Sequence, residues 1–134
     1  MTDAIPESHL YLLKPETRAL AQLALVLKDG TPHVSPLWFD YQDGLFIINT
    51  ARGRVKDRNL RRDGRVALAI ADPENQYRYL GIQGRVTGMT EQGADAHIDK
   101  MAKKYIGKDK YPWRSPHEVR VLVTITPDKV HTMG

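Results

Sequence analysis

Residues 45–71 read LFIINTARGRVKDRNLRRDGRVALAIA, and the fold prediction rests on the changes of pattern within this stretch. Residues 45–50 are rich in the β-branched and aromatic side chains that strands favour. Good helix formers then fill residues 53–62, and the Asp63-Gly64 pair that follows is typical of a helix end. The apolar run 65–71 has the pattern of a buried strand. The stretch therefore predicts a strand, a short helix and a second strand.

The sequence before this stretch extends it into a meander of strands. Residues 18–28 have the alanine and leucine content of a helix, but the Asp29-Gly30 turn and the strand-like run 32–41 favour a hairpin. Two prolines in that run cannot donate to a ladder, which predicts an edge strand or a bulge. The Asp43-Gly44 pair predicts the next turn. Residues 1–16 are expected to form a helical lead-in.

The sequence after the stretch supplies more strands and a longer helix. Residues 77–90 alternate, and the three glycines among them predict bulges that bend a strand, as barrels require. Residues 91–106 change to a helical period. Residues 119–126 form the last predicted strand, which Pro127 is expected to end. A mainly β chain of six or seven antiparallel strands with two or three short helices favours a closed or partly closed barrel.

Composition limits the classes of protein that the chain can belong to. Its 134 residues suffice for one core, so residues 1–134 are expected to form a single domain. Cysteine is absent, which excludes disulfides and cysteine nucleophiles and fits a cytoplasmic protein. No apolar run approaches the ~18 residues that cross a bilayer, and the first residues lack the pattern of a signal peptide. No membrane partner is expected.

Protein-based catalytic chemistry has no recognisable motif in the chain. The five histidines are scattered without the spacing of metal ligands. Nucleophile elbows, zinc-protease helices and phosphate-binding Walker loops are also missing from the sequence. We therefore expect neither a metal nor a catalytic side chain.

The net charge of +4 is concentrated in one segment. Residues 52–65 hold seven basic and two acidic residues, and the remainder of the chain is close to neutral. Such a patch indicates a polyanionic partner, although a solvated helix face has the same composition. Here a strand ends at Asn49 and Thr50, and the helix that follows carries Arg54 and Lys56. A helix N-terminus with these cations makes a good phosphate site.

A nucleic-acid-binding barrel is a second interpretation of the same basic segment. Basic and aromatic residues on a barrel surface can track a single strand. The aromatic residues of this chain fall largely on predicted strands, where core packing explains them. Nucleic acid is therefore not the expected partner.

Three motifs make the chain resemble a known family. They are Pro36-x-Trp38-Phe39, then Thr50-x-x-x-Arg54-x-Lys56-x-x-Asn59-Leu60-Arg61-Arg62-Asp63-x-Arg65-Val66, and finally Lys103-Lys104-Tyr105-x-Gly107-x-Asp109-x-Tyr111-Pro112-Trp113. With the strand order, they resemble the pyridoxamine-5′-phosphate-oxidase-like, FMN-binding split-barrel family over roughly residues 12–130. Within it, the chain is similar to the branch that uses the deazaflavin coenzyme F420.

The resemblance implies a homodimer of split barrels that acts as an oxidoreductase, with its active site at the dimer interface. F420 is the expected cofactor, because seven basic residues suit its polyanionic tail, and hydride would pass to a small conjugated or quinone-like acceptor. FMN is the alternative cofactor, and a flavin-binding or sensing protein without turnover is an alternative function. The implied cofactor-binding residues are Ser35, Pro36, Leu37, Trp38, Asn49, Thr50, Arg54, Lys56, Arg58, Asn59, Tyr79 and Trp113.

The resemblance also assigns parts of the cofactor to these residues. Residues 35–38 would line the ring system, and residues 49–50 would meet the phosphate or the ribityl chain. Arg54 and Lys56 would hold the phosphate, with Arg58 nearby.

The remaining assignments concern the turn, the second subunit and the substrate. Asn59 would support the turn, and Tyr79 and Trp113 of the second subunit would close the pocket. Family members that oxidise pyridoxamine phosphate grip its phosphate with a C-terminal arginine and histidine segment. Residues 128–134 lack that segment, so the chain is not expected to be a true pyridoxamine-phosphate oxidase.

Overall fold

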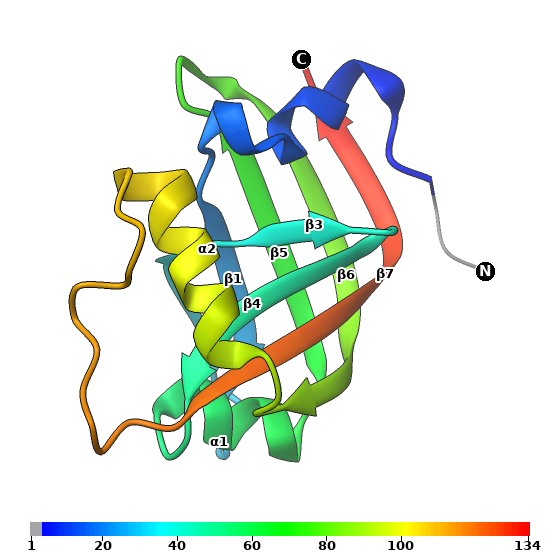
Figure 1. The fold of residues 1–134 in the computed structure, drawn as a ribbon. Helices are drawn as coiled ribbons and strands as arrows, with labels where there is room; N and C mark the ends of the chain where they lie inside the picture. The colour runs from blue at the N-terminus through cyan, green and yellow to red at the C-terminus, as the bar shows by residue number, and fades with distance from the viewer. Residues whose placement is uncertain (1–3) are drawn as a thin grey trace.

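The computed structural model describes residues 4–134 and contains one antiparallel sheet with short helices (Figure 1). The lead-in predicted over residues 1–16 includes residues 1–3, which lie outside the described part. The strands are β1 Ala21–Val26, β2 Pro32–Leu37, β3 Asp40–Gln42, β4 Leu45–Ala51, β5 Arg65–Asp72, β6 Asn75–Thr90 and β7 Arg120–Met133. The helices are the 3₁₀ helices η1 Glu7–Leu13 and η2 Pro15–Thr17, and the α-helices α1 Val55–Arg62 and α2 Ala94–Ile106.

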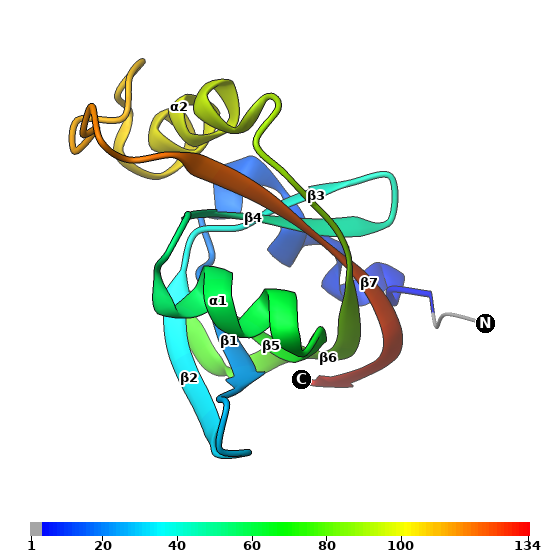
Figure 2. The same cartoon turned by 90° about the horizontal axis from the view of Figure 1, so that it is seen from below.

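The sheet curls into a barrel that is not closed along one seam. Its strand order is β2-β1-β5-β6-β7-β4-β3, so β2 and β3, which follow each other in the chain, form its two edges. Figure 2 shows α1 across one end of the barrel and α2 outside it, beside β4 and β7. The predicted class is confirmed: the fold is mainly β, a seven-stranded antiparallel split barrel.

The strand predicted over residues 32–41 is wrong as a single strand. The chain leaves β1 after Leu37 and pairs with β4 only from Asp40 onward. Between these points Phe39 is fully buried in the core, while Trp38 is half-buried at the outside of the seam. The chain thus passes from one edge of the sheet to the other at these two residues, whose side chains lie on opposite sides of the barrel wall.

The last strand does not end at Pro127 as predicted, because β7 continues to Met133. The register shifts where Gly84 of β6 lies opposite Pro127, so the missing N–H of the proline falls at a bulge. A Cβ at Gly84 would lie 2.6 Å from the carbonyl oxygen of Thr126. The glycine therefore permits the close approach that bends both strands, as predicted for residues 77–90.

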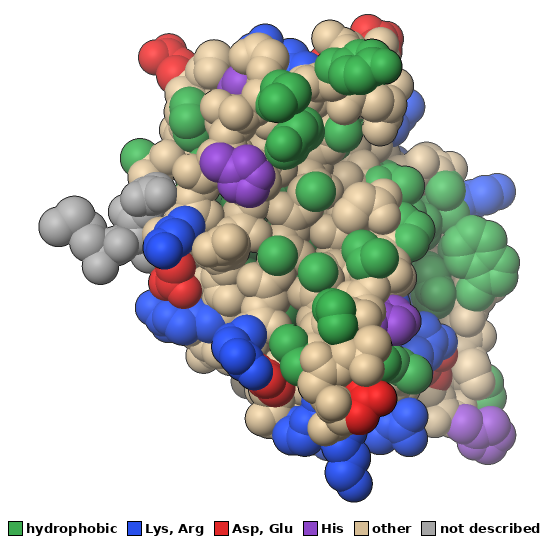
Figure 3. All heavy atoms as spheres, turned by 180° about the vertical axis from the view of Figure 1, so that it is seen from behind, with side chains coloured by type: hydrophobic (Ala, Val, Ile, Leu, Met, Phe, Trp, Pro, Cys, Tyr) green, Lys and Arg blue, Asp and Glu red, His purple; other side chains and the backbone are tan. Residues whose placement is uncertain are grey.

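The face of the barrel opposite α2 exposes several large hydrophobic residues. Figure 3 shows hydrophobic side chains spread over the middle of this face and blue side chains gathered mainly along its lower edge. The large exposed residues carried by β2, β6 and β7 and by the residue before β1 are Leu20, Val34, Tyr77 and Met133. None of the helices in residues 4–134 combines the length and apolar character needed to cross a bilayer.

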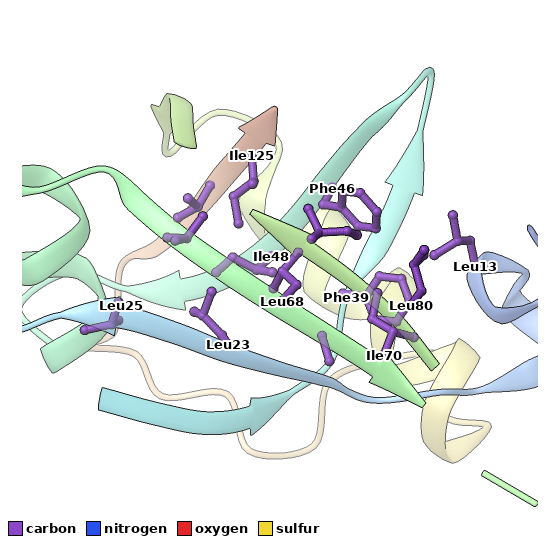
Figure 4. Packing of buried hydrophobic residues seen from close by; sticks show 14 of the residues in the cluster. Leu13, Leu23, Leu25, Phe39, Phe46, Ile48, Leu68, Ile70, Leu80 and Ile125 are labelled. Carbon is purple, nitrogen blue, oxygen red and sulfur yellow. The ribbon is translucent and has the colours of Figure 1, made fainter. Parts of the chain in front are cut away.

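The core lies inside the barrel and fixes the strand ends that carry the site. Figure 4 shows side chains from η1 and from the strands pointing toward one another. The buried residues labelled there are Leu13, Leu23, Leu25, Phe39, Phe46, Ile48, Leu68, Ile70, Leu80 and Ile125. Each such side chain contributes about 1.5–3 kcal/mol when it is fully buried. Because β4 and β7 both supply members, their paired ends are held rigidly in place.

Candidate cofactor-binding site

A pocket of about 660 Å³ lies where the ends of β2 and β4 meet α1, α2 and the loop of residues 107–119. This volume is within the range of small-molecule sites, about 300–1,000 Å³. Its walls are formed by Leu37, Trp38, Asn49, Thr50, Gly53, Arg54, Val55, Lys56, Arg58, Ile98, Met101, Tyr111, Trp113 and Arg120.

One end of the pocket is the N-terminus of α1. Gly53 has a φ of 82°, a left-handed conformation that turns the chain from β4 into the helix. Asp57 holds this turn from within the helix, since Oδ2 accepts the Gly53 N–H at 2.9 Å and Oδ1 accepts Nε–H of Arg61 at 2.8 Å. The N–H groups of residues 55–57 have no acceptor among residues 4–134. Unpaired N–H groups at a helix start stabilise an anion.

Two cations at this end have no partner in the described structure. Lys56 is half-buried and Arg58 is exposed, and neither forms an ion pair or a side-chain hydrogen bond within residues 4–134. Burial lowers the pKa of Lys56, and the neighbouring charge of Arg54 lowers it further. A desolvated ammonium beside another cation is stabilised by an anionic ligand.

A third and a fourth cation share one carboxylate. Arg54 Nη2 lies 2.5 Å from Oε2 of Glu118, whose Oε1 accepts a hydrogen bond from Nη1 of Arg120. Burial acts to raise the pKa of Glu118, but the hydrogen bond and the charges of the two arginines lower it overall. The pocket therefore holds four cations and a single ionised acid, which leaves it positive.

Glu118 and Arg120 were missed as site residues from the sequence. Arg120 starts β7 directly opposite Ala51, so strand pairing brings it to the turn before α1. The available signal was the pair Glu118-x-Arg120 in front of an apolar strand. Two opposite charges at this spacing lie on one face of a strand, where a buried run would carry hydrophobic side chains.

The other end of the pocket is an aromatic wall. The Trp38 ring stacks on Tyr105 with centroids 5.3 Å apart and an interplanar angle of 4°. Tyr111 lies 6.2 Å from Trp38 in an edge arrangement, and Trp113 lies 6.5 Å from it in a tilted one. Tyr105 is fixed in turn, because its hydroxyl donates to the carbonyl of Ala19 at 2.6 Å. Burial raises the pKa of Tyr105 to about 12 and keeps this donor protonated.

The loop that carries two of these aromatic residues is tied to α2. Asp99 Oδ1 accepts the backbone N–H of Tyr111 at 2.8 Å and a guanidinium N–H of Arg114 at 2.6 Å. A second carboxylate, Asp95, pairs with the same arginine at 3.1 Å. The i, i+4 pair of aspartates on α2 therefore holds the loop against the helix.

The structure brings eight of the twelve predicted residues together around the pocket. They are Leu37, Trp38, Asn49, Thr50, Arg54, Lys56, Arg58 and Trp113. Trp113, which was assigned to a second subunit, lines the pocket of its own chain. The hydrophobic residues Ile98 and Met101 of α2 complete the wall, whereas the helical period of residues 91–106 had predicted only that they belong to a helix.

Four predicted residues lie away from the pocket surface. Ser35 and Pro36 belong to β2 just before the pocket, and the buried Oγ of Ser35 has no partner among residues 4–134. Asn59 faces its own helix, where Nδ2 donates to the carbonyl of Val55 at 2.7 Å. Tyr79 lies in a separate groove on the outer face of the sheet, next to Leu20.

Most of the basic segment is paired within the fold. Four of its seven basic residues form ion pairs: Arg52 with Glu91, Arg54 with Glu118, Arg61 with Asp57, and Arg65 with Asp63. A fifth, Arg62, donates to the side chain of Asn59 and to the carbonyl of Val26. Only three basic residues of the segment line the pocket, so fewer charges are available to a long polyanionic tail than the sequence indicated.

The residues of the pocket fit a planar ring that carries an anionic arm. Free N–H groups and two unpartnered cations suit the anion, and Trp38, Tyr111 and Trp113 suit the ring. Within residues 4–134, no cluster of three or more acidic or histidine side chains could bind a metal ion.

Sequence comparison agrees with this geometry. The family described as pyridoxamine 5′-phosphate oxidase matches the chain over residues 9–134. The chain therefore belongs to the pyridoxamine-5′-phosphate-oxidase-like split-barrel family. No curated protein is similar enough to the chain to count as a match.

Solved structures show the same fold. A protein described as an F420 reductase is 29% identical, with 95% of this chain and 98% of that chain covered and a TM-score of 0.82. A conserved hypothetical protein from Mycobacterium tuberculosis is 21% identical, with 97% and 85% covered and a TM-score of 0.71. General stress protein 26 from Bacillus anthracis is 18% identical, with 93% and 94% covered and a TM-score of 0.62. The last two show the fold alone.

Proposed function

We propose that the chain is an oxidoreductase that binds F420 in this pocket and serves the reduction of a small conjugated or quinone-like acceptor. The observation that carries the proposal is the pairing of two free cations, Lys56 and Arg58, with an aromatic wall in one pocket. The similarity to an F420 reductase favours F420 over FMN, which has the same ring shape and also carries a phosphate. FMN remains the alternative cofactor.

In this reaction the protein binds and orients the cofactor. A bound deazaflavin or flavin supplies the hydride chemistry, which explains why no catalytic side chain is needed. Lys56, Arg58 and the N-terminus of α1 hold the anion. Trp38, fixed by its stack on Tyr105, presents a rigid surface to the ring. Tyr111 and Trp113 of the loop of residues 107–119 form that side of the pocket.

The direct test is a titration of the purified protein with F420 and with FMN, followed by ligand fluorescence. We expect F420 to bind with a Kd well below 1 mM and more tightly than FMN. Tighter binding of FMN would replace the cofactor, and the absence of binding below about 1 mM for both would overturn the proposal. Rapid mixing of protein-bound reduced F420 with a soluble quinone then separates an enzyme from a binding or sensing protein.

We further propose that two copies form a homodimer through the face opposite α2. Exposed Leu20, Val34 and Tyr77 support this, because a solvated antiparallel sheet normally carries polar side chains on its outer face. Tyr79 lines a groove of about 530 Å³ beside Leu20, so in such a dimer it would lie against the neighbouring copy. Light scattering after size-exclusion chromatography should give twice the 15.2 kDa mass. The exposed-face change Val34→Glu should shift this toward the monomer, and a wild-type monomer would refute the dimer.

A further inference from the structure

Arg120 is the most deeply buried cation in the pocket, and it lies between the turn before α1 and the aromatic wall. Only 5% of the residue is exposed, whereas Arg58 is exposed and Lys56 half-buried. Its guanidinium lies 5.4 Å from the ring centroid of Tyr111. Since Tyr111 packs on Trp38 and Trp113, Arg120 borders the aromatic part of the pocket as well as the turn before α1.

The guanidinium is held in one orientation by two acceptors. Nε donates to Oδ1 of Asn49 at 2.8 Å, and Nη1 donates to Oε1 of Glu118. Both bonds leave Nη2 without a partner in the described residues, although Arg120 lines the pocket. Among the described residues Nη2 is not one of the buried unpaired side-chain atoms, so it is open to the pocket and can donate to an acceptor on a bound ligand.

The orientation of Asn49 is itself determined by its neighbours. Its Nδ2 donates to the carbonyl of Ala94 at 2.9 Å and lies 3.2 Å from Nδ1 of His97. A flipped amide would place its oxygen against the Ala94 carbonyl and its NH₂ against Arg120, so only the present orientation is favourable. His97 is packed on its other side against Asp40, with Nε2 3.3 Å from Oδ2. The predicted ligand contact at Asn49 is therefore better explained as the positioning of Arg120.

We propose that Arg120 binds an electron-rich oxygen on the planar part of the ligand, and that Asn49 and Glu118 position it for this contact. The inference rests on the proposed function and deepens it. The pocket then selects a ligand with two acceptor ends: an anionic arm at α1, and a carbonyl or enolate oxygen on the ring at Arg120. A simple phosphate satisfies only one of the two, and a flat hydrocarbon ring satisfies neither.

The test compares ligands that have the anion, the ring or both. The probes are FMN, riboflavin, F420, its ring–ribityl fragment without phosphate, and inorganic pyrophosphate. Titrations use wild type, Arg120→Gln, Lys56→Ala and the control Arg85→Gln, an exposed arginine of β6 that pairs with Asp128. Circular dichroism and thermal unfolding show which variants fold. If Arg120→Gln does not, the charge-balanced double variant R120Q/E118Q takes its place.

We expect Arg120→Gln to weaken all ring-containing probes that wild type binds by about 10- to 100-fold, and pyrophosphate by less than threefold. Lys56→Ala should weaken the probes that carry an anion, namely pyrophosphate, FMN and F420, but not riboflavin or the ring–ribityl fragment, and Arg85→Gln should match wild type. Unchanged ring affinity in Arg120→Gln, or an equal loss for pyrophosphate, overturns the inference and leaves the proposed function intact. Failure of wild type to bind any ring probe overturns both.

Discussion

Lys56→Ala tests the anion site most directly, because the side chain has no structural partner to lose. Its ammonium is half-buried, unpaired and close to Arg54, and both burial and that charge lower its pKa. Removing it should therefore leave the free energy of unfolding within about 0.5 kcal/mol of wild type. Replacing a side chain of the barrel core by alanine would lower the free energy of unfolding by more than this.

The effect on ligand binding should be much larger. A charge-assisted hydrogen bond to a phosphate contributes about 1–3 kcal/mol, which corresponds to a Kd about 5- to 150-fold higher for F420 or FMN. Because the pKa of Lys56 is lowered, its cationic form is lost at a lower pH than for an ordinary lysine. Wild-type affinity should thus fall as pH rises through that depressed pKa, and the variant should show a flatter profile.

The assay is a fluorescence or calorimetric titration with thermal unfolding of the same samples. Lys28→Ala removes an exposed lysine of the β1–β2 turn and serves as the matched control. The assignment of the site is refuted if Lys56→Ala binds as wild type does, if Lys28→Ala loses as much affinity, or if Lys56→Ala is strongly destabilised.

Three further predictions concern the barrel and the aromatic wall. Gly84→Ala should destabilise the fold by about 2–3 kcal/mol in chemical unfolding, because its Cβ would lie 2.6 Å from a backbone oxygen. Gly88→Ala, whose Cβ would have its nearest contact at 3.7 Å, should destabilise the fold less. Similar losses of stability in the two variants would contradict the role of Gly84 in the bulge. Burial lowers the pKa of Lys104 from 10.5 to about 8, so the unfolded chain binds more protons between these values and stability should rise with pH across them. Lys104→Met should reduce that rise in unfolding free energy, and an unchanged slope would contradict it. Tyr105→Leu should weaken binding of ring-containing ligands by about 0.5–1.5 kcal/mol through the loss of the stack on Trp38, while pyrophosphate binding, measured by calorimetry, should not change.

The pattern of the chain determined the elements because their signals are local. The strand of residues 45–50, the helix after it and the helical stripe of α2 depend on side chains a few positions apart, and all were predicted within three residues of their bounds. The errors fall where distant residues decide. Pro127 stays within β7 because Gly84, 43 positions earlier in the chain, provides a bulge opposite it. The run of residues 32–41 divides because the barrel has a seam there.

The candidate site divides in the same way. Lys56, Arg58 and the turn at Gly53 follow from consecutive residues, so the sequence alone predicted an anion site at the start of α1. Which basic residues are free was decided only by the fold, since Glu91 comes from a distant segment to neutralise Arg52. The fold also brings Arg120 to the pocket through the pairing of β7 with β4. A linear pattern records which charges a chain has, but the partner of each charge depends on contacts that only strand pairing and helix packing create.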